Sequence, residues 1–144
     1  YQGLDRSDRL RAYSDHLCTM METGLYTFIA HPDIFGCSTD FWTENLTACS
    51  RDILAAAEST GVPLEVNGGG FRKSPARARS GTRSQYPWLP FWELAADYDM
   101  SVVCNSDAHR PEDVLANLDD TLAVVQQCGL QLADLSMLGI GYGV

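Results

Sequence analysis

The sequence predicts an α/β protein in which short parallel strands alternate with helices. Apolar runs begin near Leu25, Leu64 and Ser101, at intervals of 39 and 37 residues, and polar residues follow each run. Segments whose apolar residues recur with helical spacing lie between these runs. This rhythm is typical of successive βα units, either in an open doubly wound sheet or in part of a (β/α) barrel.

The elements are expected in a regular order along the chain. They are a helix over 6–22, a buried strand over 25–30, a helix over 41–59 capped by Ser38 or Thr39, a strand over 64–67, a helix over 87–98, a strand over 101–105 and a helix from Pro111 to about 127. Trp88 and Trp92 are expected in the core, and His16 on the surface. A last short turn or strand is expected within 132–141.

The composition indicates a soluble globular protein. The 144 residues suffice for one domain or part of a larger one, with 45% hydrophobic and 20% charged residues. No apolar run approaches membrane-spanning length, so no membrane partner is expected. Five cysteines without a C-x-x-C pair favour free thiols in the cytoplasm. The chain does not begin with Met, which favours a fragment.

The net charge of −9 argues against general nucleic-acid or anionic-membrane binding. Five of the ten basic residues nevertheless fall within the twelve positions 72–83, where no acidic residue occurs. Residues 72–86 are therefore interpreted as a flexible basic loop. Such a loop either contacts a small anionic substrate such as a phosphate ester, or is simply a solvated segment.

Polar residues follow each of the three predicted strands. They are His31 with Asp33, Glu65 with Asn67, and Asp107 with His109. Because the carboxyl ends of parallel strands meet at one rim of a sheet, we expect these side chains to converge. Imidazole and carboxylate ligands without thiolate suit Zn, Mn or Fe in hydrolytic sites.

Each of these residues has both a functional and a structural interpretation. His31, Asp107 and His109 could bind metals that activate a water molecule, or Asp107 could cap the next helix with His109 as a surface residue. Glu65 could contact a ligand or substrate, or be a buried carboxylate paired with Arg72 or Arg110.

A glycine-rich turn precedes two of the basic residues. Arg72 and Lys73 directly follow Gly68-Gly69-Gly70 and Phe71, so their side chains and the backbone N–H groups of the turn could bind a phosphate dianion. The glycines alone are a weak phosphate signal.

Four segments, taken in chain order, resemble the polymerase and histidinol phosphatase (PHP) superfamily, most closely its histidinol-phosphate phosphatases. They are Ile29-Ala-His-Pro-Asp33, Leu64-Glu-Val-Asn-Gly-Gly-Gly-Phe-Arg-Lys73, Tyr86-Pro87 and Asn105-Ser-Asp-Ala-His-Arg-Pro-Glu-Asp113. The resemblance covers residues 13–130. Its specificity lies in the order and spacing of these segments rather than in any one of them.

The resemblance implies a distorted (β/α)7 barrel whose carboxyl rim holds up to three divalent metal ions (Zn, Mn or Fe). It implies a metal-dependent phosphatase of histidine biosynthesis that hydrolyses a small phosphate monoester. By match of motif, the metal ligands are His31, Asp107 and His109, of which Asp107 and His109 are the catalytic pair, and the substrate-binding residues are Glu65, Asn67, Arg72 and Lys73.

The sequence departs from the family in one respect. The His-x-His motif with which such proteins open is absent, and the only histidines are His16, His31 and His109. Residues 1–144 then correspond to the carboxyl-terminal portion of one PHP-type barrel. We expect the chain alone to be inactive and to associate with the missing amino-terminal half or with another copy.

Two other interpretations stay open. The chain could be a degenerate, non-catalytic barrel half that acts as a binding or interaction module. It could also belong to a PHP-type esterase for another substrate, such as a sugar phosphate or a nucleotide 3′ end.

Overall fold

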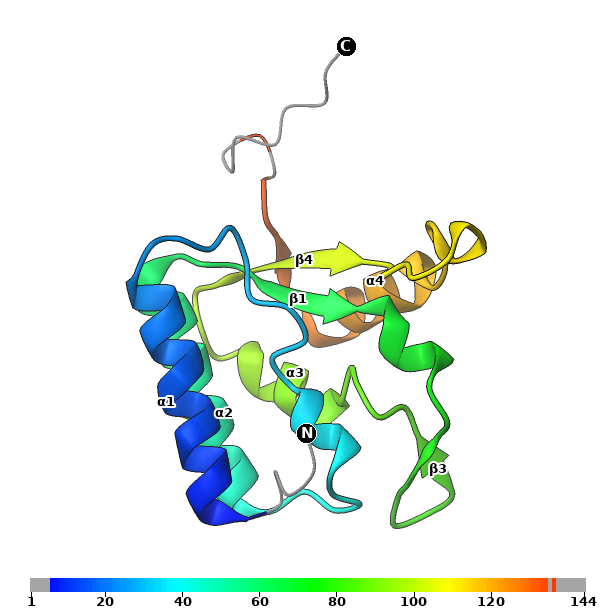
Figure 1. Ribbon diagram of the computed structural model, residues 1–144, viewed down its shortest axis with the longest axis horizontal. Helices are drawn as coiled ribbons and strands as arrows, with labels where there is room; N and C mark the ends of the chain where they lie inside the picture. The colour runs from blue at the N-terminus through cyan, green and yellow to red at the C-terminus, as the bar shows by residue number, and fades with distance from the viewer. Residues whose placement is uncertain (1–5, 135, 137–144) are drawn as a thin grey trace.

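The computed structural model describes residues 6–134 and 136 and has a mixed α/β fold (Figure 1). A three-stranded parallel sheet has the order β1-β4-β5, with β1 at Leu64–Asn67, β4 at Ser101–Asn105 and β5 at Gln131–Leu132. The helices that join these strands are α3 (Leu89–Ala95) and α4 (Leu118–Cys128). The sequence predicted β1 and β4 with these bounds, so the α/β class is confirmed.

The predicted strand over 25–30 is wrong in extent. Only Ile29 pairs with the sheet, through an isolated parallel bridge to Leu64. Leu25 is 83% exposed and Tyr26 is 44% exposed, so the start of the run is not buried as expected. A run of apolar residues becomes a strand only where a neighbouring strand pairs along its length, and here β1 offers a partner to one residue.

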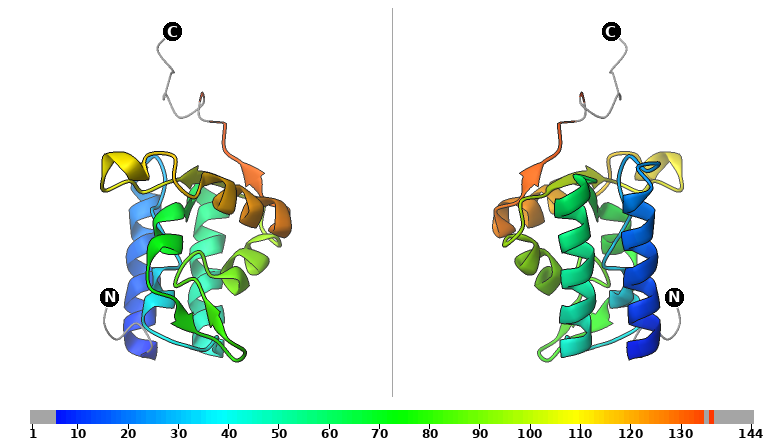
Figure 2. Two further views of the ribbon diagram at one scale, coloured as in Figure 1. Left: turned by 90° about the vertical axis from the view of Figure 1, so that its right-hand side faces the viewer. Right: turned by 90° about the vertical axis from the view of Figure 1, so that its left-hand side faces the viewer.

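Two long helices lie side by side and cover one end of the molecule (Figures 1 and 2). Helix α1 (Ser7–Glu22) buries Leu10, Leu17 and Met21 at helical spacing, as predicted. Helix α2 (Glu44–Thr60) begins after Thr43, whose hydroxyl accepts a hydrogen bond from the Leu46 N–H at 3.3 Å. The predicted caps, Ser38 and Thr39, are wrong because they follow a separate 3₁₀ turn, η1 (Ile34–Cys37).

The helix predicted from Pro111 to about 127 is two elements. A 3₁₀ turn, η3 (Pro111–Asp113), is followed by Leu115 and Asn117 with φ angles of 67° and 59°, and α4 begins only at Leu118. Non-glycine residues with positive φ cannot continue a right-handed helix. Of the predicted element at 132–141, only Leu132 belongs to β5, and residues 135 and 137–141 lie outside the described residues.

The core contains the tryptophans that the sequence placed there. Trp92 is fully buried and Trp88 is 5% exposed. Asp33, from the His31-Pro-Asp segment, is buried beside them, and its Oδ2 accepts hydrogen bonds from the Trp88 backbone N–H (2.6 Å) and from Trp92 Nε1 (3.0 Å). Asp33 therefore holds α3 against the segment that follows Ile29.

Part of the basic segment 72–86 is ordered as an antiparallel hairpin of β2 (Ala76–Arg77) and β3 (Thr82–Arg83). The Arg83 guanidinium lies 3.6 Å from the centre of the Trp88 ring and donates to four backbone carbonyls, including Gly36 O at 3.0 Å. Arg83 thus packs the hairpin against the Trp88 ring and the η1 turn, and a substrate contact of the basic segment stays a prediction. The flexibility of the segment stays a prediction.

Over residues 6–134 and 136, no helix combines the length and the apolar character that crossing a bilayer requires.

Candidate functional site

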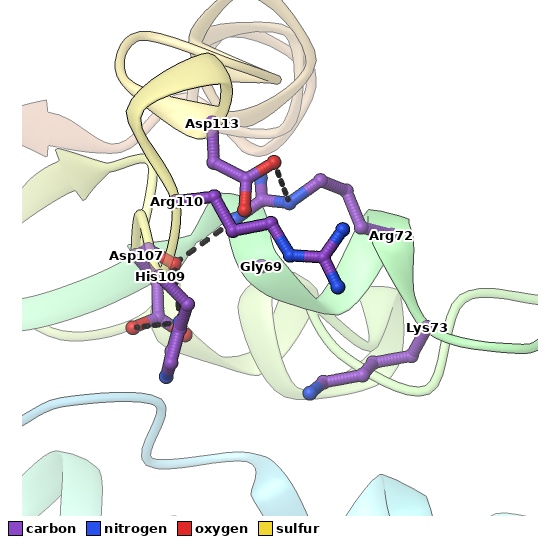
Figure 3. A pocket seen from close by; sticks show the side chains of 7 residues that line it. All are labelled: Gly69, Arg72, Lys73, Asp107, His109, Arg110 and Asp113. Atoms are coloured by element: carbon purple, nitrogen blue, oxygen red, sulfur yellow. Dashed lines mark hydrogen bonds and ion pairs between the residues drawn. The ribbon is translucent and has the colours of Figure 1, made fainter.

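The carboxyl ends of β1 and β4 lie next to each other, with Asn67 paired to Asn105. Each strand leads into a loop on the same side of the sheet: β1 into the 3₁₀ turn η2 (Gly68–Arg72), and β4 into residues 106–110. A pocket of about 370 Å³ opens between these loops (Figure 3). Its lining residues are Gly69, Arg72, Lys73, Asp107, His109, Arg110 and Asp113.

The Arg72 guanidinium joins the two loops. Its Nη2 donates to the backbone carbonyls of Ser106 (2.6 Å) and Asp107 (3.0 Å), and its Nη1 donates to that of Gly68 (3.3 Å). The side chain is 25% exposed. Arg72 therefore holds the loop after β4 against the turn after β1.

Arg72 also reaches the loop before α4. Its Nη1 donates to Asn117 Oδ1 at 3.1 Å, and its Nε lies 3.6 Å from Asp113 Oδ1 in an ion pair. An arginine has five N–H donors, and here each of its three nitrogens has an acceptor within the chain. The predicted contact of Arg72 with phosphate stays a prediction; in this structure its Nη1 and Nη2 make four hydrogen bonds within the chain, and its Nε faces Asp113.

Asp107 and His109 form a pair at the pocket wall, as expected from their spacing. His109 Nδ1 lies 2.9 Å from the Asp107 carbonyl oxygen and 3.8 Å from Asp107 Oδ1. Because a carbonyl oxygen only accepts, this contact fits the ring form that carries a proton on Nδ1, and the Nε2 lone pair of that tautomer is then free for a ligand. The alternative that Asp107 caps a helix is wrong, since the next turn begins after Arg110 without a side-chain cap.

Gly69 makes room for the Asp107 carboxylate. A Cβ added at Gly69 would lie 2.6 Å from Asp107 Oδ2 and 2.9 Å from Asn67 Oδ1. The absence of a side chain at this position therefore lets the carboxylate lie against the η2 turn.

Lys73 and Arg110 are the cations of the pocket whose donors are free. Both are exposed, and over residues 6–134 and 136 the structure gives neither side chain a hydrogen bond or an ion pair. In Figure 3 the Lys73 side chain extends from the end of η2 toward the wall formed by Asp107 and His109. The Arg110 guanidinium lies in the same view between Lys73 and Arg72.

Glu65 and Asn67 are buried beneath the pocket and do not line it. Glu65 Oε2 accepts from the His31 backbone N–H (2.9 Å) and from Asn67 Nδ2 (2.8 Å), and Oε1 accepts from Asn105 Nδ2 (2.8 Å). Asn67 Oδ1 in turn accepts from the Gly69 N–H at 2.8 Å. The two residues set the positions of the strand ends, and their predicted contact with substrate stays a prediction.

The structural alternative for Glu65 was right about burial and wrong about the partner. Neither Arg72 nor Arg110 pairs with Glu65, because both arginines line the pocket and Glu65 does not. Three neutral donors satisfy the carboxylate instead. A buried carboxylate that accepts several hydrogen bonds needs no arginine.

The residues present do not by themselves form a metal site. Of the three predicted ligands, Asp107 and His109 lie together, whereas His31 does not line the pocket. His31 has a φ of 33° and its ring lies 5.9 Å from that of Tyr86. Within residues 6–134 and 136, no group of three or more His, Cys, Asp or Glu side chains is placed to bind a metal ion, and a protein site for Zn²⁺ usually provides at least three.

Sequence reasoning missed the parts of the pocket that the loop before α4 supplies. Asp113 and Asn117 contact Arg72, and Arg110 faces the cavity. The position of Arg110, directly after the Asp-Ala-His segment, was the available signal. Asn117 gave none, because it is 45 residues from its partner.

The pocket has an excess of positive charge. It carries Arg72, Lys73 and Arg110 against Asp107 and Asp113, on a chain of net charge −9. Such a cavity at the carboxyl ends of parallel strands can bind a small anion. Comparison of the sequence with models of protein families and with curated proteins gave no match.

Proposed function

We propose that this chain is part of a metal-dependent phosphoesterase of the PHP type that hydrolyses a small phosphate monoester, with histidinol phosphate as the first candidate. One observation carries the proposal: a cationic pocket at the carboxyl ends of two adjacent parallel strands also contains the Asp107–His109 pair. Anion-binding and ligand-type side chains thus meet at the place where α/β proteins bind their substrates.

The strand order agrees with one arc of a barrel. The segment at Ile29, then β1, β4 and β5 are neighbours in chain order and run parallel. A barrel adds each strand beside the last in this way, as does one half of a doubly wound sheet. Helix α3 contacts both α2 and α4, as helices on one face of a barrel wall do.

The proposed enzyme needs more metal ligands than these residues supply. The PHP resemblance includes divalent metals (Zn, Mn or Fe) that activate a water molecule, and their remaining ligands have to come from the amino-terminal half of the barrel or from another copy. His109 Nε2 and the Asp107 carboxylate are the atoms of this chain that are oriented to take part. His31 is proposed as a third ligand on the motif alone.

The test is phosphatase activity of the protein in which this chain occurs, on histidinol phosphate and on an aryl phosphate, with Mn²⁺, Zn²⁺ or Fe²⁺ and after EDTA. Asp107→Ala and His109→Ala should each abolish metal-dependent turnover. His16→Ala, at an exposed position of α1, is the matched control and should retain it. Full activity in both pocket variants would refute the proposal.

A second candidate function is that of a degenerate barrel half acting as a binding or interaction module. The absence of a three-ligand group within residues 6–134 and 136 favours it, as does the exposure of His109, whose side chain is 74% accessible. This candidate predicts no bound metal in elemental analysis of the protein. Stoichiometric Zn, Mn or Fe would exclude it.

A further inference from the structure

We infer that Lys73 and Arg110 bind the phosphate group of the substrate and that Arg72 positions the pocket wall instead of contacting the anion. The inference deepens the proposed function and rests on it. Its starting point is a contrast between two arginines that line the same cavity: Arg72 has its donors occupied by the chain, and Arg110 has them free.

Arg72 cannot turn to an anion without breaking the wall of the pocket. Its Nη2 donates to the backbone oxygens of Ser106 and Asp107, at 2.6 and 3.0 Å. Releasing them would leave the Ser106 carbonyl without its Arg72 donor and the Asp107 carbonyl with His109 alone. An acceptor left unpaired in a partly buried loop costs more than a neutral exchange of hydrogen bonds. Its charge is also compensated by Asp113, at 3.6 Å.

Lys73 and Arg110 offer the donors that a phosphate dianion requires. A lysine provides three N–H donors and an arginine five, the latter in a fork that fits two phosphate oxygens. Both side chains line the pocket and both are exposed, so they can bind an anion without first losing another partner. They enter the pocket from different loops, one after β1 and one after β4.

The charge around these two cations is not cancelled locally. Of the two pocket carboxylates, Asp113 is paired with Arg72, which leaves Lys73 and Arg110 opposite the single carboxylate of Asp107. Lys73 and Arg110 therefore keep a positive potential at the cavity. We expect the pocket to bind phosphate in the absence of metal.

The experiment titrates inorganic phosphate into the full chain in the presence of EDTA and follows backbone amide shifts by NMR. Lys73→Gln and Arg110→Gln should each raise the Kd about tenfold, because each removes charge-assisted hydrogen bonds. Arg77→Gln removes the same charge from the exposed hairpin outside the pocket, and its Kd should stay within about twofold of wild type.

Conservative variants separate the two arginines. Arg110→Lys keeps the charge and loses the fork, so its Kd should lie between those of wild type and Arg110→Gln. Arg72→Lys keeps the charge but cannot reach two carbonyls at once, so it should shift the amides of residues 106–109 before any phosphate is added.

Three results would overturn the inference. In the first, the wild-type chain shows no saturable phosphate binding. In the second, Lys73→Gln and Arg110→Gln bind phosphate like wild type. In the third, Arg72→Lys loses phosphate binding while its phosphate-free spectrum is unchanged. Failure of the proposed function is distinguishable. Phosphate binding without metal-dependent turnover contradicts the phosphatase alone, and turnover insensitive to Arg110→Gln contradicts the inference alone.

Discussion

Arg72 and His109 share one acceptor, the backbone oxygen of Asp107, which lies 3.0 Å from Arg72 Nη2 and 2.9 Å from His109 Nδ1. A carbonyl oxygen has two lone pairs and can serve both donors. The orientation of the imidazole is thus connected to a guanidinium that is itself held by three other acceptors and an ion pair. The position of His109 Nε2 depends on Arg72 through this single atom.

Replacing Arg72 by Lys should lower the free energy of unfolding by about 1–3 kcal/mol, because hydrogen bonds to a charged group are lost and acceptors are left unpaired. Urea denaturation measures the change. Arg77→Lys, at an exposed position of the hairpin, is the matched control and should unfold like wild type. Coincident transitions for Arg72→Lys and wild type would contradict the role given to Arg72.

Gly69→Ala should displace the Asp107 carboxylate, since the added Cβ would lie 2.6 Å from Oδ2. The expected loss of stability is about 1–3 kcal/mol, with shifted backbone resonances at residues 106–109. Gly129→Ala provides the comparison: it has a φ of 67° and no atom within 4 Å of an added Cβ. It should destabilise through the backbone alone and leave the pocket resonances unchanged. Similar pocket spectra for both variants would contradict the close packing at Gly69.

Asp33 should make the stability of the protein depend on pH. Burial raises the pKa of its carboxyl to about 7, against hydrogen bonds from Trp88 and Trp92 that lower it. Between about pH 4 and 7 the folded chain keeps a proton that the unfolded chain releases, so the free energy of unfolding falls as pH rises through this window. The change amounts to ~4 kcal/mol at most.

Asp33→Asn removes this titration while its Oδ1 can still accept from the Trp88 N–H. The variant should therefore show a flatter stability profile from pH 4 to 7, measured by urea denaturation at several pH values. Asp97→Asn, at an exposed position, should keep the wild-type slope. Parallel profiles for Asp33→Asn and wild type would show that Asp33 is ionised in the folded protein.

Sequence patterns were sufficient for the elements whose structure is set locally. Helices α1 and α2 follow from the spacing of their apolar residues, and β1 and β4 from short apolar runs. The strand predicted over 25–30 was wrong in extent because strand pairing depends on the neighbouring segment, and only Ile29 pairs with β1. The helix predicted from Pro111 was wrong because Leu115 has a positive φ, and leucine is not a residue type from which a positive φ can be predicted.

In the candidate site, too, local features were predictable from the sequence and long-range contacts were not. Asp107 and His109 lie two positions apart on one loop, so their proximity was predictable. The role of Arg72 was not, because its partners include Asn117 and Ser106, 45 and 34 residues away. A basic residue after a glycine-rich turn suggests a phosphate contact until the acceptors around it are known.

Glu65→Gln tests whether Glu65 acts on substrate or on the fold. An amide in place of the carboxylate would turn an N–H toward at least one of its donors, the His31 N–H or the Asn67 and Asn105 amides. We expect a loss of about 2–4 kcal/mol in unfolding free energy. Wild-type stability with weakened phosphate ester binding would instead support the predicted substrate contact.

Metal binding by the chain alone should be weak. Over residues 6–134 and 136 no three-ligand group exists, and tight Zn²⁺ binding needs several ligands fixed together. Zn²⁺ added to the chain should shift the His109 resonances, and a mild chelator should reverse the shift. Asp107→Ala should reduce the shift, while His16→Ala should not change it. Stoichiometric Zn²⁺ that survives the chelator would show that the residues of this chain form a complete metal site, and would contradict the weak binding expected here.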